Sequence, residues 1–225
     1  MKLLICALLL TTAGAFGQTA PPRSTVQATG TASVSVTPDQ AQINVSAVTS
    51  AATAQEAANQ NATLATTVQQ AIAQALGTSG SVKTIGYSVT PNYNFPRDGS
   101  PAVLIGYTVT NSIQVTLNDL TIAGKVIDSA TQAGASRIDS LQFTLKDDTE
   151  ARSQALKAAV LKAKAKADAM AASLGLKTTS VLVIQESGAV VTPLTGVAGT
   201  AASTPITPGQ LTVTGNVTIS VEMTQ

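Results

Sequence analysis

The stretch from Asp147 to Gly175 constrains the fold most, because it has the pattern of one long amphipathic helix. Asp147 and Glu150 form an Asp-type capping box at its start, and Gly175 provides a left-handed stop. Between these ends apolar residues recur at steps of four and three, which lays them along one side of a helix. These residues are Leu156, Val160, Ala163, Ala167, Met170 and Leu174. Such a stripe must be buried, and we expect it to pack on the neighbouring strands.

Two further helices are predicted from their caps and stops. A capping box at Thr53 begins a helix that ends at Gly77. Asn118 or Asp119 caps another helical segment, and Gly134 ends it. Both segments carry apolar residues at helical spacing, so both are expected to cover a sheet.

Alternation of apolar and polar residues predicts the strands. Strands over residues 26–36 and 43–47 flank a Thr-Pro-Asp turn and are expected to form a hairpin. Further strands are predicted over residues 138–145, 179–184 and 211–223. The order of these elements favours an α+β fold, with a mainly antiparallel sheet packed by helices that include the long C-terminal one.

Two unusually long extended runs, residues 82–95 and 103–117, flank a turn rich in Pro and Gly. At about 3.3 Å per residue each run reaches roughly 45 Å, far beyond a usual strand of about 5–6 residues. We therefore expect a long β-hairpin that protrudes beyond the helices. Its aromatic residues are interface candidates if the hairpin projects, and core residues if it does not. They are Tyr87, Tyr93, Phe95 and Tyr107.

A second interface candidate is a stripe of small residues on the long helix, opposite the apolar stripe. Its members are Ala158, Ala165, Ala169 and Ala172. Close packing on another subunit is one interpretation, and simple helix propensity is the alternative.

The first residues predict export. Lys2 is followed by an apolar run from Leu3 to Leu10 and by a small-x-small cleavage pattern at residues 15–17. We expect residues 1–17 to be a signal peptide, with a buried N-terminal helix as the alternative. The run is too short to span a bilayer, so no integral membrane span is expected in the mature chain. The predicted location is the periplasm or the exterior.

The remaining domain boundaries follow from composition. Residues 18–25 are expected to be a flexible leader, and residues 26–225 one domain. Within it, residues 187–210 are rich in Gly, Pro, Thr, Ala and Ser without periodicity, which predicts a loop before the last strand.

Composition excludes much chemistry. The chain has no histidine, its single cysteine is Cys6, and its net charge is +1. Without histidine the commonest general base and metal ligand is absent. The acidic cluster over residues 147–150 is explained by helix capping, so no metal site, cofactor or catalytic residue is predicted. Nucleic acid is not expected either, because the lysines over residues 157–166 flank the apolar stripe on both sides instead of forming one patch.

Three stretches resemble the SIMPL-domain family, which includes the periplasmic immunogenic proteins of Gram-negative bacteria. They are the opening VQATGTASVSVTPD over residues 26–39, GYTVTNSIQV over residues 106–115, and the Ala/Lys-rich helix over residues 151–175. The resemblance implies a signal peptide, an α+β domain and, for some members, ring-like or channel-like oligomers. It implies no enzymatic activity or catalytic residue. Oxidative-stress tolerance and host immune recognition are linked to the family.

The sequence leaves three hypotheses. The first is a non-enzymatic periplasmic or secreted protein that self-assembles, as a ring-like oligomer with a structural or stress-related envelope role. The second is a monomeric binding module whose pocket between sheet and helices takes a small apolar or peptide ligand. The third is a histidine-free hydrolase, in which a lysine such as Lys164 would have to serve a serine or threonine.

Overall fold

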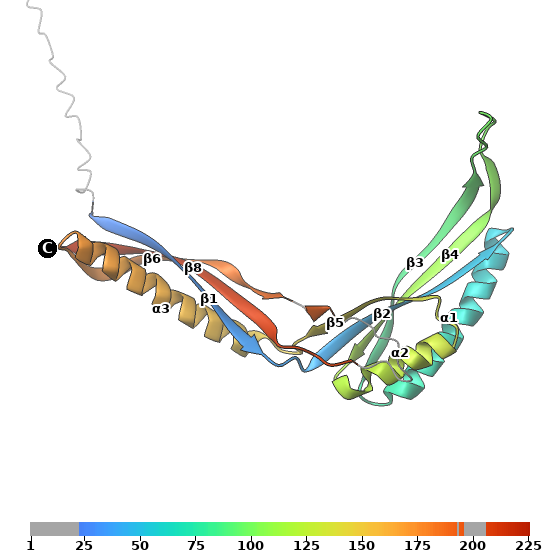
Figure 1. Ribbon diagram of the computed structural model, residues 1–225, viewed down its shortest axis with the longest axis horizontal. Coiled ribbons are helices and arrows are strands. Elements are labelled where there is room, and N and C mark those ends of the chain that lie inside the picture. The colour runs from blue at the N-terminus through green and yellow to red at the C-terminus, as the bar shows by residue number, and fades with distance from the viewer. Residues whose placement is uncertain (1–22, 193, 196–205) are drawn as a thin grey trace, which may run out of the picture.

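The computed structural model describes residues 23–192, 194–195 and 206–225. They form two antiparallel sheets and three α-helices, which confirms the α+β class. The strands do not build one sheet, however. The two sheets lie end to end, each with its own helices, so the molecule is elongated and bent (Figure 1).

The first half is a three-stranded sheet with one helix. Its order is β1 (Thr25–Val36), β8 (Leu211–Thr224) and β6 (Lys177–Thr192), with α3 (Thr149–Ser173) on one face. The other face is lined by hydroxyl side chains, which pair across strands. Thr29 lies 2.8 Å from Thr218, and Ser33 lies 2.9 Å from Thr214.

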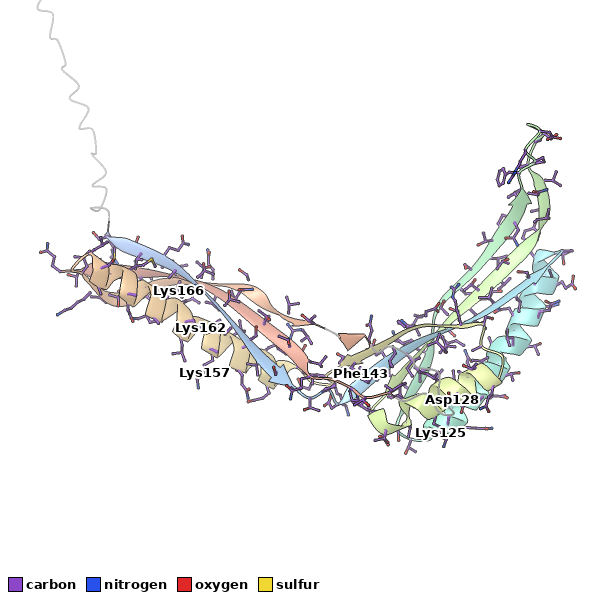
Figure 2. All side chains as sticks on the ribbon, viewed as in Figure 1. Lys125, Asp128, Phe143, Lys157, Lys162 and Lys166 are labelled. Carbon is purple, nitrogen blue, oxygen red and sulfur yellow. The ribbon has the colours of Figure 1, made fainter. Side chains whose placement is uncertain are left out.

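The second half is a five-stranded sheet with two helices. Its order is β3 (Gly80–Asn94), β4 (Val103–Leu117), β2 (Gln40–Ala51), β5 (Arg137–Thr144) and β7 (Leu194–Thr195). The helices are α1 (Ala54–Leu76) and α2 (Ala123–Gln132), the latter preceded by a 3-10 turn, η1 (Leu120–Ile122). Its core consists of large aliphatic side chains and one phenylalanine, including Ile43, Val45, Val68, Ile72, Ile113, Leu117 and Phe143. Phe143 lies on β5, on the side of this half that faces the other half (Figure 2).

The predicted hairpin between the first two strands is wrong. β1 pairs with β8, whereas β2 lies between β4 and β5 in the other sheet. The Thr-Pro-Asp segment between them carries the chain from one half to the other. The carboxylate of Asp39 accepts a hydrogen bond from the backbone N–H of Lys146 at 2.7 Å, which fixes the crossing.

The long helix is confirmed, but the prediction of its buried stripe is wrong. Met170 and Leu174 are 40% and 68% exposed, and Leu156 and Val160 only flank the interface. The buried positions are alanines at every fourth residue: Ala151, Ala155, Ala159, Ala163, Ala167 and Ala171. Only Ala163 and Ala167 belong to both sets.

Two glycines of the sheet explain this choice of alanine. A Cβ atom built on Gly30 of β1 would lie 2.0 Å from the carbonyl oxygen of Ala159, and one on Gly215 of β8 would lie 2.9 Å from the carbonyl carbon of Ala155. The backbone of α3 therefore touches the backbone of the sheet. No side chain larger than a methyl group fits between them.

The ends of the helices follow the sequence more closely. The hydroxyl of Thr53 accepts a hydrogen bond from the N–H of Glu56 at 3.2 Å, as a capping box requires. Asp147 accepts one from the N–H of Thr149 at 2.9 Å, although Asp148 is the capping residue by position. Gly134 and Gly175 have φ of 93° and 72°, in the left-handed region that ends helices.

Residues 187–192, predicted as the start of a loop, form the end of β6. Ala189 pairs with Gly215 and Val191 with Val213, so small and apolar residues here serve the interface beneath α3. Residue 193 and residues 196–205 of the predicted loop lie outside the described residues.

The predicted signal peptide and most of the predicted leader also lie outside the described residues. β1 begins at Thr25, the last residue assigned to the leader. In the part of the chain that the structure describes, no helix has both the length and the apolar content needed to cross a bilayer.

Candidate association surfaces

The β3–β4 hairpin projects because its neighbours end before it does. β2 stops at Ala51, which pairs with Tyr107, and α1 begins at Ala54. Beyond Tyr107, from Gly106 to the turn, β4 pairs with β3 alone. We call residues 85–105 the arm; it forms the upper right end of the molecule in Figure 1. The predicted long hairpin is confirmed, including register shifts beside Gly86 and opposite Gly106.

The aromatic residues of the arm are largely in water. Tyr87, Tyr93 and Phe95 are 56%, 49% and 75% exposed. Burial in the monomer core, the alternative for these residues, is therefore wrong. Tyr107 is half-buried at the level where β2 ends. That these residues form an interface stays a prediction.

The arm has one apolar face and one polar face. Tyr87 pairs with Asn111 and Val89 with Val109, so both share the face that α1 covers further down the sheet. Tyr93 and Phe95, two residues apart, have ring centroids 6.5 Å apart. On the opposite face the amide of Asn92 donates to the hydroxyl of Thr108 at 2.8 Å. The apolar face of the arm thus continues the core of its sheet into solvent.

Most of the small-residue stripe of α3 lies away from the sheet, but Ala158 packs against the core beneath the helix. Ala165, Ala169 and Ala172 are exposed and Ala158 is half-buried. Lys157 and Lys162 project from the same helix into solvent (Figure 2). Alanines at these positions also follow from helix propensity, so the stripe by itself identifies no partner.

A second apolar surface, which the sequence reasoning missed, lies on β6. Val181, Leu182, Val183, Ile184 and Val190 are all exposed; we call them the β6 patch. β6 is an edge strand of the three-stranded sheet, and α3 packs mainly over β1 and β8. The run Val181–Ile184 has the continuous apolar pattern of a strand covered on both faces. This apolar run is the sequence feature that could have indicated a surface in need of a partner.

The β6 patch occupies both faces of its strand. Val181 pairs with Val221 and Ile184 with Ile219, on the face that carries α3. Val183 pairs with Ser220 and Val190 with Thr214, on the hydroxyl face. Because directly opposite residues share a face, a partner that covers this patch must contact both sides of the edge strand or extend it.

Lysines of α3 lie on both sides of the row of buried alanines, which differs from the apolar stripe that they were predicted to flank. Lys164 donates to Asp168 and to the hydroxyl of Thr178 on β6, the latter at 2.9 Å. Lys166 donates to the backbone carbonyl of Thr29 on β1 at 2.8 Å. These two lysines therefore join α3 to the outer strands of its sheet. Lys164, the candidate lysine of a hydrolase, is held in an ion pair.

The carboxylates at the start of α3 are hydrogen-bonded to groups of the helix itself. Hydrogen bonds from the side chain and the N–H of Thr149 lower the pKa of Asp147. A hydrogen bond from Arg152, 2.7 Å away, lowers the pKa of Asp148 against the opposing effect of burial. Among the described residues, no three His, Cys, Asp or Glu side chains come together as a metal ion requires.

A groove runs between α1 and the outer edge of β3. It has a volume of about 470 Å³ and is lined by Thr66, Gln69, Gln70, Ala73, Val82, Lys83 and Thr84. It lies between sheet and helix, where the sequence placed the pocket of a binding module. It is an open groove, and Lys83 is the one charged residue in its lining.

Comparison with known proteins shows which family this sequence matches. The sequence profile of the SIMPL family, described as a protein of unknown function (DUF541), matches residues 26–221. Two relatives, from Brucella melitensis biotype 1 and Brucella abortus, are each named 26 kDa periplasmic immunogenic protein. Each is 31% identical over 164 residues, which cover 70% of this chain and 65% of the relative. The similarity thus spans just under two thirds of the length of either relative.

Proposed function

From the premise that the chain belongs to the SIMPL family, we propose that it is a non-enzymatic periplasmic protein that assembles with copies of itself. The assembly is a ring-like oligomer with a structural or stress-related role in the cell envelope. The periplasmic location rests on the names of the two relatives. The observation that carries self-assembly is the exposed apolar face of the arm.

The size of that face supports association. At 150–250 Å² per aromatic side chain, the exposed fractions of Tyr87, Tyr93 and Phe95 leave roughly 350 Å² of aromatic surface in water. Val89, which pairs with Val109, and Leu104, which pairs with Tyr93, lie on the same face and are also exposed. A monomeric protein rarely exposes a continuous apolar patch of more than a few hundred Å², and a stable interface buries about 800 Å² on each partner. The apolar face of the arm is thus at the upper limit of what a monomer exposes and would supply a large part of one side of an interface.

Light scattering on protein expressed from the whole chain tests this proposal. We expect a particle several times heavier than one chain. The double substitution Tyr93→Ser and Phe95→Ser removes the two rings at the end of the arm, and we expect it to lower the mass to that of a monomer. Circular dichroism should not change, because neither ring contributes to the core.

The polar face of the same strand offers a matched control. Ser88→Ala with Thr90→Ala alters two exposed arm residues without removing apolar surface, and should leave the particle intact. A wild-type protein that stays monomeric at every accessible concentration contradicts the proposal.

The groove between α1 and β3 favours a second candidate, a monomeric module that binds an extended peptide or a small apolar ligand. Peptides commonly bind in this way, as an added strand along an exposed edge beside a helix. A monomeric wild-type protein whose melting temperature rises with an added apolar peptide, and does so less in Ala73→Glu, would favour this candidate over assembly.

A further inference from the structure

We propose that copies of this chain join head to tail, with the arm of one copy bound along the β6 patch of the next. The inference rests on the proposed self-assembly and specifies which two surfaces meet. It follows from the placement of the surfaces, from their unpaired strand edges, and from their charge.

The two surfaces lie at opposite ends of an elongated molecule. The arm extends from the five-stranded half, and β6 belongs to the three-stranded half with α3 (Figure 1). One chain therefore cannot cover its own β6 patch with its own arm. Two different surfaces at opposite ends allow each copy to bind two neighbours, which produces a ring when the rotation between copies closes.

Both surfaces have an unpaired strand edge. β3 is the outer strand of the five-stranded sheet, and β6 is an outer strand of the three-stranded sheet. An exposed apolar edge strand is a template for pairing with another chain. The two strands also have similar lengths, with 15 residues in β3 and 16 in β6. Pairing between them would extend the β6 sheet and place arm residues next to both faces of the β6 patch.

The other edge of the three-stranded sheet is less open to pairing. Lys166 of α3 donates to the backbone carbonyl of Thr29 on β1, so a charged side chain lies across this edge. Lysine at an edge strand opposes pairing with another chain. This leaves β6 as the edge of the three-stranded sheet that is available to a partner.

The charges of the two surfaces are compatible. Residues 178–185 of β6 carry no charge, and neither do residues 85–96 of the arm; Glu186 borders the first segment, and Arg97 and Asp98 border the second. Contact between these two segments therefore buries no unpaired charge, which would be costly. Arm-to-arm contact would also avoid this cost, but it would leave the β6 patch of every copy in water. Head-to-tail contact covers both apolar surfaces with one kind of interface.

Mixing two variants with complementary defects tests the inference. The arm variant carries Tyr93→Ser and Phe95→Ser; the β6 variant carries Leu182→Lys and Ile184→Lys. Each variant alone should have the mass of a monomer, because each lacks one of the two surfaces. Equal amounts mixed together should form a 1:1 dimer of twice the monomer mass and nothing larger, because only one pair of intact surfaces remains.

The outcomes separate the inference from the proposed function. If the wild type assembles and the β6 variant assembles as well as the wild type, arm-to-arm contact is favoured and the head-to-tail inference is wrong. A mixture that stays monomeric contradicts it as well. A monomeric wild type overturns the proposed function itself. If circular dichroism shows that the double β6 variant is unfolded, Val190→Lys, at a position 61% exposed, tests the same surface with one substitution.

Discussion

The two halves of the molecule solve the packing of a helix on a sheet in different ways. In the five-stranded half, α1 and α2 are held off the sheet by Val68, Ile72 and other large side chains. In the three-stranded half, α3 lies directly on Gly30 and Gly215 and buries alanines at every fourth position. In the first core, large side chains fill the space between helix and sheet. In the second, the backbones of helix and sheet lie so close that almost no space is left.

The difference teaches that apolar size does not identify the buried side of a helix. In α1 the largest aliphatic residues face the sheet, whereas in α3 Leu161 is 64% exposed and Ala159 is fully buried. A small residue in α3 is a requirement of the sheet, because a longer side chain would meet backbone atoms of β1 or β8. Substitutions that add volume should therefore lower the free energy of unfolding most in the three-stranded half. Substitutions that remove volume should lower it most in the five-stranded half.

The largest effect is expected from adding a methyl group to the close contact. Gly30→Ala places a Cβ atom 2.0 Å from the carbonyl oxygen of Ala159, so α3 must move off the sheet. We expect a loss of about 3–5 kcal/mol in the free energy of unfolding, at or above the upper range for overpacked cores. Urea denaturation followed by circular dichroism measures it.

Gly86→Ala makes the same chemical change in β3, where the nearest atom to the new Cβ would be 3.7 Å away. It should be neutral or slightly stabilising, because Ala restricts the unfolded chain more than Gly does. Equal losses for the two variants would mean that the contact between α3 and β1 is looser than described.

The next largest effect concerns removal of volume. Ile72→Ala in α1 should lower the free energy of unfolding by roughly 2–4 kcal/mol, because it leaves a cavity in a core of large side chains. Leu161→Ala in α3 should change it by less than about 0.5 kcal/mol, since that leucine is mostly in water. The same denaturation experiment compares them, and a large loss for Leu161→Ala would restore the leucine stripe as the buried side.

The smallest effect is expected from pH, in the three-stranded half. Hydrogen bonds from Lys164 and then from Thr178 lower the pKa of Asp168 below its usual 3.8. A lowered pKa in the folded state contributes stability that is present above pH 3.8 and is lost as the pH falls through the lower value. Asp168→Asn should therefore be less stable than the wild type near pH 6, with the difference shrinking towards pH 3. The midpoint of urea unfolding at the two pH values checks this.

The sequence predicted what depends on short stretches of chain. Thr53 and Gly77 marked the ends of α1, because a cap and a left-handed stop are local hydrogen-bond and backbone requirements. The alternation over residues 82–117 predicted the long hairpin, whose two strands are joined by a short turn. The exposure of Tyr93 and Phe95 was one of the two alternatives that the length of that hairpin left open.

What failed depends on partners far away in the chain. The pairing of β1 with β8 joins residues almost 200 positions apart, and no local pattern specifies it. The buried alanines of α3 are explained only by Gly30 and Gly215, whose spacing in sequence does not relate them to the helix. The sequence predicts a short strand over residues 179–184, but the local pattern does not show that this strand lies at a sheet edge with its apolar side chains exposed, because a continuous apolar run is the usual pattern of an interior strand.

The contact of α3 with Gly30 and Gly215 has a thermodynamic consequence beyond its geometry. Alanine and glycine have no rotamers to lose on burial, so this helix docks with almost no loss of side-chain conformational entropy at the contact itself. In the core of the five-stranded half, each large side chain loses rotamer freedom when it is buried. The entropic cost of fixing side chains grows with temperature. For each side chain buried, the free energy of docking α3 should therefore become unfavourable less steeply with rising temperature than that of docking α1.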